Sequence, residues 1–358
     1  MRLGADTVSS LTIPPGELIG RLEHVCQAGG LNDVAALAFH TPAHGRIHDV
    51  YLVHDSSHPF VLQRVNTNVI ADPVAPARVS ECALQAQGIE NGLLNWPATG
   101  TALLFCLDSC WLRRGWIYGK PPEQPVTVKQ VQGMSRALRH FHQTIDLAAF
   151  KNCRYASIDP WSGIAGLLLQ ESISNPQLQL DSYEREAIAQ LGRARQTLAL
   201  LQDSTVANCP AKLPVVVHRD PKPSNFIERS RGDMVLIDFD TIGIGAAEQD
   251  LGEMLRALLT GDESSESKVT TADDCKGLIH QIQQGYGDSA MTQRRISLAA
   301  CHSCLWQAER YLEDHLAGDR YYKVISRGDN LLRTRAQLEG FDLVYVASSG
   351  TGPQIEQL

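Results

Sequence analysis

The stretch that decides the fold is "VVVHRDPKPSNFIERSRGDMVLIDFDT", residues 215–241. Apolar, β-branched runs lie on both sides of its polar loop and predict two short strands. Within the loop, His218, Asp220 and Asn225 follow the spacing H-x-D-x-x-x-x-N, which is typical of a kinase catalytic loop. A second carboxylate, Asp238, comes directly after the apolar run "MVLI". The stretch therefore predicts phosphoryl transfer.

These residue types suit that chemistry. A hydroxyl nucleophile needs a carboxylate to accept its proton, and Asp220 is the expected base. Mg²⁺ prefers oxygen ligands, which Asn225 and Asp238 offer. His218 is expected to orient the loop by hydrogen bonding. A loop whose polar residues only cap strands is the alternative, and the second carboxylate at the expected distance argues against it.

The composition limits the classes of protein. With 358 residues the chain is long enough for two lobes, and a net charge of −8 argues against a nucleic-acid partner. The first 20 residues lack a secretory signal, and no run of about 18 apolar residues exists, so we expect a cytoplasmic protein with no membrane partner. Nine cysteines, including the pairs in "CLDSC" and "CHSC", suggest reduced thiols rather than a metal site. The oligomeric state stays open.

The order of predicted elements suggests an α+β fold. Residues 14–30 and 73–88 are expected to be helical, and strands are expected at 33–41, 47–55, 59–66, 101–108 and 111–119. A Pro-rich stretch at 120–127 follows, and helical patterns then dominate at 128–145, 183–202 and from Asp250 onward. We therefore predict a bilobal, kinase-like fold. An N-terminal nucleotide-binding lobe (1–118) with a small antiparallel sheet would precede a larger, mainly helical catalytic and substrate-binding lobe (119–358).

The motif also resembles a family. "HRDPKPSN" (218–225), "IDFDTIG" (237–243) and "DLGEMLR" (250–256) look like the aminoglycoside-phosphotransferase-like small-molecule kinases. An A-P-E segment, which protein kinases use to dock peptides, is missing, and this favours a small-molecule acceptor. Three further stretches are similar to N-acetylhexosamine 1-kinases: "GRIHDVYLV" (45–53), "FVLQRVNTNVIADP" (60–73) and "ERYLEDHLAGDRYYKVISRGDNLLRTRAQL" (309–338).

The resemblance implies an enzyme that uses ATP and Mg²⁺ to phosphorylate the anomeric hydroxyl of an N-acetylhexosamine, giving a sugar 1-phosphate. It implies that Asp220 is the base and that Asn225 and Asp238 bind the metal. The residues expected to reach the sugar are Asp49, Arg46, Arg310 and Tyr321.

Nucleotide binding departs from the kinase pattern, because the glycine-rich loop is nearly absent and there is no V-A-I-K lysine. The position of that lysine falls on Gln63 or Arg64, and Arg64 is preferred since a guanidinium grips phosphate oxygens in a bidentate way. Glu81, in the following helix, is the expected partner of Arg64. Lys222 is a further expected nucleotide contact.

Two alternatives remain. The acceptor could instead be homoserine, choline, methylthioribose or an aminoglycoside, because Arg46 stands where the sugar 1-kinases have His. A nucleotide-binding pseudokinase that regulates a partner is the other alternative. The joint presence of Asp220, Asn225 and Asp238 argues against it.

Overall fold

The computed structural model describes residues 11–12, 14–42, 49–54, 59–65, 74–89, 92–123, 125–145, 180–206, 214–229, 233–261, 270–322 and 324–349. The chain forms two compact units. Unit 1 comprises Met1–Lys120, Ala148–Tyr155 and Ile237–Asp240, and unit 2 comprises Pro121–Leu147, Ala156–Leu236 and Thr241–Leu358. The short segment Ile237–Asp240 therefore belongs to the same unit as the N-terminal sheet, and it contains Asp238.

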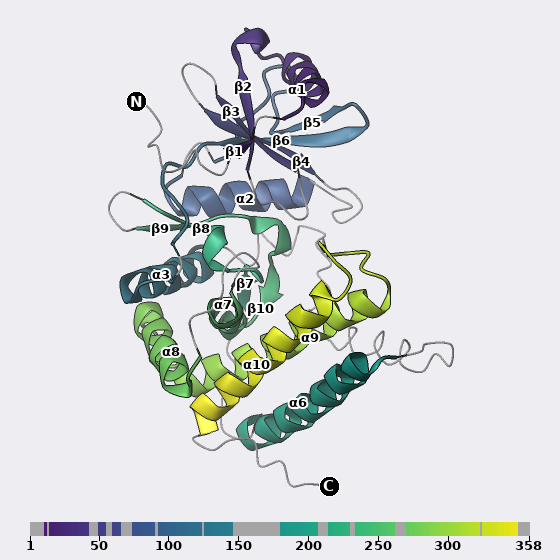
Figure 1. The fold of residues 1–358 in the computed structure, drawn as a ribbon. Helices are drawn as coiled ribbons and strands as arrows, with labels where there is room; N and C mark the ends of the chain where they lie inside the picture. Colours follow the sequence, from purple (N-terminus) through teal and green to yellow (C-terminus); the bar gives the residue numbers. More distant parts are fainter. Residues whose placement is uncertain are drawn as a thin grey trace. The chain divides into compact units, whose positions relative to one another are not determined.

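Unit 1 is built on a six-stranded sheet in the order β1-β2-β3-β4-β6-β5, with antiparallel neighbours throughout (Figure 1). The strands are β1 (Leu11–Thr12), β2 (Ala38–Pro42), β3 (Asp49–His54), β4 (Phe60–Val65), β5 (Leu103–Cys106) and β6 (Ser109–Gly115). The five predicted strands are confirmed as β2 to β6. The first is shorter than predicted, because Val34–Ala36 form a 3₁₀ turn before it.

Of the described helices of unit 1, α1 (Gly16–Ala28) and α2 (Val74–Ala86) pack on opposite faces of this sheet, whose successive residues point to alternate sides. Helix α1 contributes Leu22, Val25 and Cys26 to a core with Phe60, Leu62 and Trp111. Helix α2 places Ala77 in a separate cluster with Val65, Cys110 and Leu112. We call these two sides of the sheet the α1 face and the α2 face.

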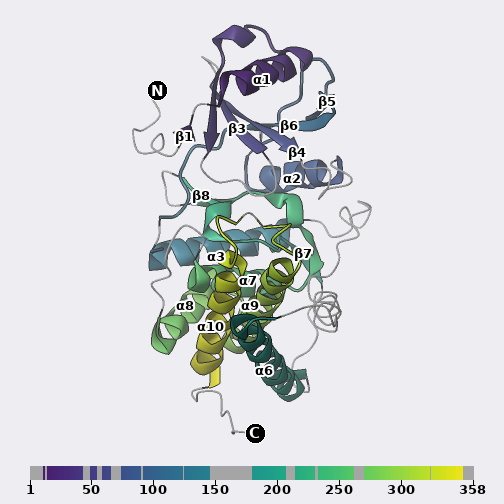
Figure 2. The same cartoon turned by 45° about the vertical axis from the view of Figure 1, so that its right-hand side comes forward.

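Unit 2 is mainly helical, as predicted. The helices that the structure describes in it are α3 (Val128–Thr144), α6 (Ser182–Val206), α7 (Ala247–Thr260), α8 (Ala272–Tyr286), α9 (Gln293–Leu316) and α10 (Asp329–Ser349). Helix α9 packs against α7, α10 and α6 (Figures 1 and 2). Helix α3 begins at a capping box, in which the Thr127 hydroxyl and the Gln130 side chain bond each other's backbone N–H groups.

Two small antiparallel sheets of two strands each carry the polar motif in unit 2. Strand β7 (Val215–Val217) pairs with β10 (Gly243–Gly245), and β8 (Phe226–Glu228) pairs with β9 (Met234–Leu236). The two strands predicted around the motif are thus confirmed as β7 and β9, each with its own partner. In the described part of the chain, no helix has the length and apolarity needed to cross a membrane.

Candidate active site

The catalytic loop starts where β7 ends. His218 directly follows this strand and is fully buried, and its carbonyl accepts a hydrogen bond from Thr241 Oγ1 at 2.8 Å. Arg219 has a left-handed backbone, with φ of 72°. Such a conformation is costly for a non-glycine residue and persists only where the surroundings enforce it. The loop is therefore held in a strained shape.

One carboxylate in α7 enforces that shape. Asp250 is completely buried and accepts backbone hydrogen bonds from His218 and Arg219, each at 2.7 Å. It also bonds His142 Nε2 of α3 at 2.8 Å, and the Nδ1 atom of the same ring lies 3.0 Å from the Tyr286 hydroxyl. Burial raises the pKa of Asp250, but the hydrogen bonds and charges of His142 and His218 together outweigh it and hold the pKa below the ordinary value of 3.8.

Asp220, the predicted base, is positioned from its own loop. Its Oδ2 atom accepts hydrogen bonds from Lys222 Nζ at 2.9 Å and from Asn225 Nδ2 at 3.1 Å. Asn225 Nδ2 also donates to the Asp220 carbonyl at 2.7 Å. The structure thus brings together the predicted residues Asp220, Lys222 and Asn225, and the partly exposed carboxylate can accept a proton.

The two predicted metal ligands offer hard oxygen atoms. Because the amide nitrogen of Asn225 points at Asp220, its Oδ1 atom is the one that remains for a cation, and it accepts no hydrogen bond from a described residue. Asp238 follows β9, is exposed, and has a left-handed backbone with φ of 66°. This donor chemistry fits Mg²⁺, which typically takes one or two protein carboxylates together with substrate phosphates.

Gln63 and Arg64, the two candidates for the lysine position, point to opposite faces of the sheet. Arg64 lies on the α1 face, is about two-fifths exposed, and forms an ion pair with Asp49 at 2.6 Å. Gln63 lies on the α2 face, is buried, and donates to Asp240 Oδ2 at 3.2 Å. Its Oε1 atom accepts a hydrogen bond from Arg114 Nε at 2.6 Å.

The expected pairing of Arg64 with Glu81 is wrong. Glu81 belongs to α2, which packs on the face opposite to Arg64, and its exposed carboxylate forms no ion pair with any described residue. The partner of Arg64 is Asp49, which lies directly across from it on β3.

Two predicted sugar-binding residues lie together in unit 2. The Arg310 guanidinium lies 5.0 Å from the centre of the Tyr321 ring and 4.7 Å from that of Trp306. Tyr321 belongs to the loop between α9 and α10, which we call the α9–α10 loop (residues 317–328). The Asp314 carboxylate holds this loop by accepting backbone hydrogen bonds from Arg320, Tyr321 and Tyr322 at 2.8–2.9 Å.

Some candidate functional residues were not predicted from the sequence. His142, Trp306 and Arg114 are polar or aromatic residues within ordinary helix or strand patterns, so no spacing signal marked them. Asp250 stood in the quoted "DLGEMLR" stretch without an assigned role. Arg46, another predicted sugar contact, lies outside the described residues.

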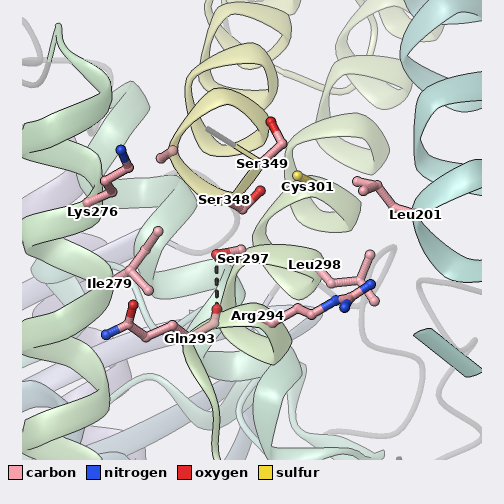
Figure 3. Close-up of a pocket in the computed structure, with 11 residues that line it drawn as sticks. Leu201, Lys276, Ile279, Gln293, Arg294, Ser297, Leu298, Cys301, Ser348 and Ser349 are labelled. Carbon is pink, nitrogen blue, oxygen red and sulfur yellow. Dashed lines mark hydrogen bonds between the residues drawn. The ribbon is translucent and has the colours of Figure 1, made fainter. Parts of the chain in front are cut away.

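Unit 2 also contains a cavity of about 360 Å³ that is separate from the motif (Figure 3). Helices α6, α8, α9 and α10 line it, with Leu201, Lys276, Ser297 and Ser348 among the residues around it. None of the predicted site residues contributes to its wall. The cavity is therefore not part of the candidate active site.

Comparisons with known proteins bear on the family. A model of the phosphotransferase enzyme family matches residues 39–296, more than half of the chain. Among similar solved structures is a spectinomycin phosphotransferase in complex with ADP and spectinomycin, with a TM-score of 0.61 and 14% identity, covering 87% of this chain and 92% of that one. Another is the ethanolamine kinase of Plasmodium vivax, with a TM-score of 0.61 and 14% identity, covering 92% of this chain and 90% of that one. A third is the amicoumacin kinase hAmiN in complex with AMP-PNP, Ca²⁺ and Ami, with a TM-score of 0.58 and 13% identity, covering 94% of this chain and 96% of that one.

At this level of identity the structures establish a kinase-like fold, which confirms the predicted α+β architecture. The family match adds the class of enzyme to the fold. The chain belongs to the phosphotransferase enzyme family.

Proposed function

We propose that this protein is an ATP- and Mg²⁺-dependent kinase that phosphorylates the anomeric hydroxyl of an N-acetylhexosamine or a similar sugar. The observation that carries the reaction type is the Asp220 carboxylate, held by Lys222 and Asn225 at the end of β7. A carboxylate held in this way can accept the proton of a hydroxyl acceptor as the phosphoryl group transfers.

Each residue of the loop has a distinct role in this proposal. Asp220 positions the hydroxyl and takes its proton. Lys222, which already touches the carboxylate, provides a positive charge for the transferring phosphoryl group. His218 and Asp250 do no chemistry themselves: they fix the backbone from which Asp220 projects.

Mg²⁺ would be held by Asn225 Oδ1 and by the carboxylate of Asp238. A bound Mg²⁺ neutralises charge on the phosphate oxygens during transfer. The Asp238 carboxylate would compensate part of the metal charge, and the neutral Asn225, whose amide nitrogen bonds Asp220, would couple a bound metal to the Asp220 loop.

The acceptor assignment depends on the resemblance of the α9–α10 region to the sugar 1-kinases and on the cluster around Arg310. An exposed aromatic ring such as Tyr321, which is 51% exposed, can pack on a pyranose face. The guanidinium edge can donate to sugar hydroxyls or to an acetamido carbonyl. Asp49 and Arg46 are proposed as further sugar contacts from the resemblance alone.

The charge of Arg310 also bears on the alternative acceptors. Arg310 is partly buried, and no carboxylate of a described residue lies within ion-pair distance of it. Glu313, one turn further along α9, interacts electrostatically with this guanidinium without an ion-pair contact, and a half-buried cation repels another cation. Choline, ethanolamine and aminoglycosides are cationic, so this residue favours a neutral, N-acetylated acceptor.

An acceptor screen tests the proposal. The purified protein is incubated with ATP and Mg²⁺ and with single acceptors: N-acetylglucosamine, N-acetylgalactosamine, free hexosamines, choline, ethanolamine, homoserine and an aminoglycoside. The readout is the mass shift of one added phosphate. We expect turnover of an N-acetylated hexosamine, with the corresponding free amine much poorer.

Turnover of only an amino alcohol would contradict the sugar assignment. ATP binding without turnover of any acceptor would favour the pseudokinase alternative.

A further inference from the structure

If the N-terminal sheet binds nucleotide phosphates, it needs a positively charged side chain. None of its strands contains a lysine. The first lysine of the chain is Lys120, beyond the last strand of the sheet. Before it, the arginine side chains that the structure describes are Arg21, Arg64, Arg113 and Arg114. Arg21 is exposed on α1.

The strand register separates the other three. Arg113 pairs with Leu62, and its guanidinium lies 4.6 Å from the centre of the Phe60 ring, so it belongs to the α1 face with Arg64. Arg114 pairs with Val61 and points to the other side. Of these described arginines on the sheet, Arg114 alone lies on the α2 face, with Gln63.

Arg114 is held in a closed polar network. Its Nε atom donates to Gln63 Oε1 at 2.6 Å, and its Nη2 atom lies 3.4 Å from Asp240 Oδ1. Gln63 Nε2 completes the network by donating to Asp240 Oδ2 at 3.2 Å. The Arg114 and Asp240 side chains are 15% and 8% exposed, so the pair is largely shielded from solvent.

This network contains the same kinds of group as the expected ion pair between a strand lysine and a carboxylate. The groups come from different positions in the chain. Gln63 occupies the strand position where a kinase lysine is expected, but it is neutral. The positive charge comes from the neighbouring strand β6, and the orienting carboxylate is Asp240, two residues after the proposed metal ligand Asp238. A guanidinium has five N–H donors, and the Nη1 atom of Arg114 makes no hydrogen bond with a described residue.

We infer that Arg114 is the cation of unit 1 that binds the nucleotide phosphates, with Gln63 and Asp240 as the residues that orient it. This inference rests on the proposed use of ATP. It moves the expected phosphate contact from Arg64 to Arg114, since Arg64 is on the other face and already pairs with Asp49.

Binding of ATP and of adenosine separates this role from a purely structural one. Dissociation constants are measured by calorimetry for the wild type and for Arg114→Gln, Arg114→Lys and Arg113→Gln. Arg113→Gln is the matched control, because it removes the adjacent arginine from the opposite face. Removal of charged hydrogen bonds to phosphate predicts that Arg114→Gln weakens ATP binding by about 10- to 100-fold. Adenosine binding should stay unchanged.

Arg114→Lys keeps the charge but lacks the planar guanidinium with its several N–H donors. Its ATP affinity should lie between those of the wild type and Arg114→Gln. If Arg114→Gln does not fold, a selective several-fold loss of ATP affinity in Arg114→Lys carries the same conclusion. Equal loss of ATP and adenosine would make Arg114 a structural anchor only and overturn the inference. So would unchanged ATP binding, or a selective loss in Arg113→Gln.

The inference and the proposed function fail in different ways. A wild-type protein that binds no ATP would contradict the proposed cosubstrate itself. Normal ATP binding that is insensitive to Arg114 would contradict only this inference, and the identity of the acceptor affects neither measurement.

Discussion

Asp250 shows how much of the site depends on a single buried side chain. Both of its oxygens are used: Oδ1 accepts from the Arg219 backbone, and Oδ2 from the His218 backbone and His142. The left-handed backbone of Arg219 costs free energy, which these hydrogen bonds offset. The position of Asp220 therefore depends on Asp250.

Replacing Asp250 with Asn should destabilise the protein and impair turnover. Asn replaces one carboxylate oxygen with an NH₂ group, which faces a backbone N–H donor in place of an acceptor. This leaves a buried hydrogen bond unmade and removes the charge that partners His142. We expect a loss of about 2–4 kcal/mol in the free energy of unfolding, measured by urea denaturation at neutral pH. Unfolding identical to that of the wild type would show that the anchor contributes nothing.

The difference in the free energy of unfolding between the wild type and Asp250→Asn should depend on pH in a definite direction. The pKa of Asp250 is lower in the folded state than its ordinary value of 3.8, so its contribution is fully present above that value. It is lost as the pH falls through the folded-state pKa. The stability gap between the wild type and Asp250→Asn should thus be constant just above about pH 5 and shrink below about pH 4. A gap that widens on acidification would contradict this linkage.

At the scale of single residues, the sequence predicted the grouping within one loop but not the contacts between distant elements. Asp220, Asn225 and Lys222 come together because they share one short loop. The partners of Asp250 could not be predicted, since His142 and Tyr286 lie on α3 and α8 and meet it only through helix packing.

Among the elements, the α9–α10 loop links local structure to the proposed acceptor site. Asp314 sits near the end of α9 and accepts three consecutive backbone N–H groups, from Arg320 to Tyr322. Asn330 of α10 donates to the same carboxylate at 2.9 Å. These bonds place Tyr321 beside Arg310.

Asp314→Asn should therefore raise the KM for the sugar while the KM for ATP stays within about twofold. The substitution removes a carboxylate acceptor that holds Tyr321 in place before the sugar binds. Part of the binding free energy must then be used to order the loop. We expect the KM for the sugar to rise roughly 5- to 50-fold. Glu339→Gln, an exposed change on α10, is the control. Parallel increases in both KM values would point to general destabilisation rather than to this loop.

The long elements were predictable, and so were short strands with an apolar, β-branched run such as β7, but β10 was not. Helices α1, α2 and α3 begin and end within three residues of the predicted limits, because Pro, Gly and capping residues bound apolar periodic runs. Strand β10 consists of Gly243, Ile244 and Gly245, which show no alternation, so it could be recognised only through its pairing with β7.

For the whole molecule, the family match and the kinase-like fold agree with the architecture predicted from the sequence. The faces of the N-terminal sheet were beyond prediction. Gln63 and Arg64 are neighbours in a strand that is apolar on both sides, so periodicity does not indicate which of them lies on the α2 face. The answer comes from α1 and α2, which cover opposite faces, and from Asp240, which is 126 residues from Arg114.

The most direct test of the central claim is the position of the new phosphate. The wild type and Asp220→Asn are incubated with ATP, Mg²⁺ and the N-acetylhexosamine that the screen selects, and the product is examined by ³¹P and ¹H NMR. We predict an acid-labile phosphate on the anomeric carbon, with kcat lowered about 10²- to 10⁴-fold in Asp220→Asn and sugar affinity little changed. Phosphate on the 6-hydroxyl, or an Asp220→Asn variant with normal kcat, would contradict the account.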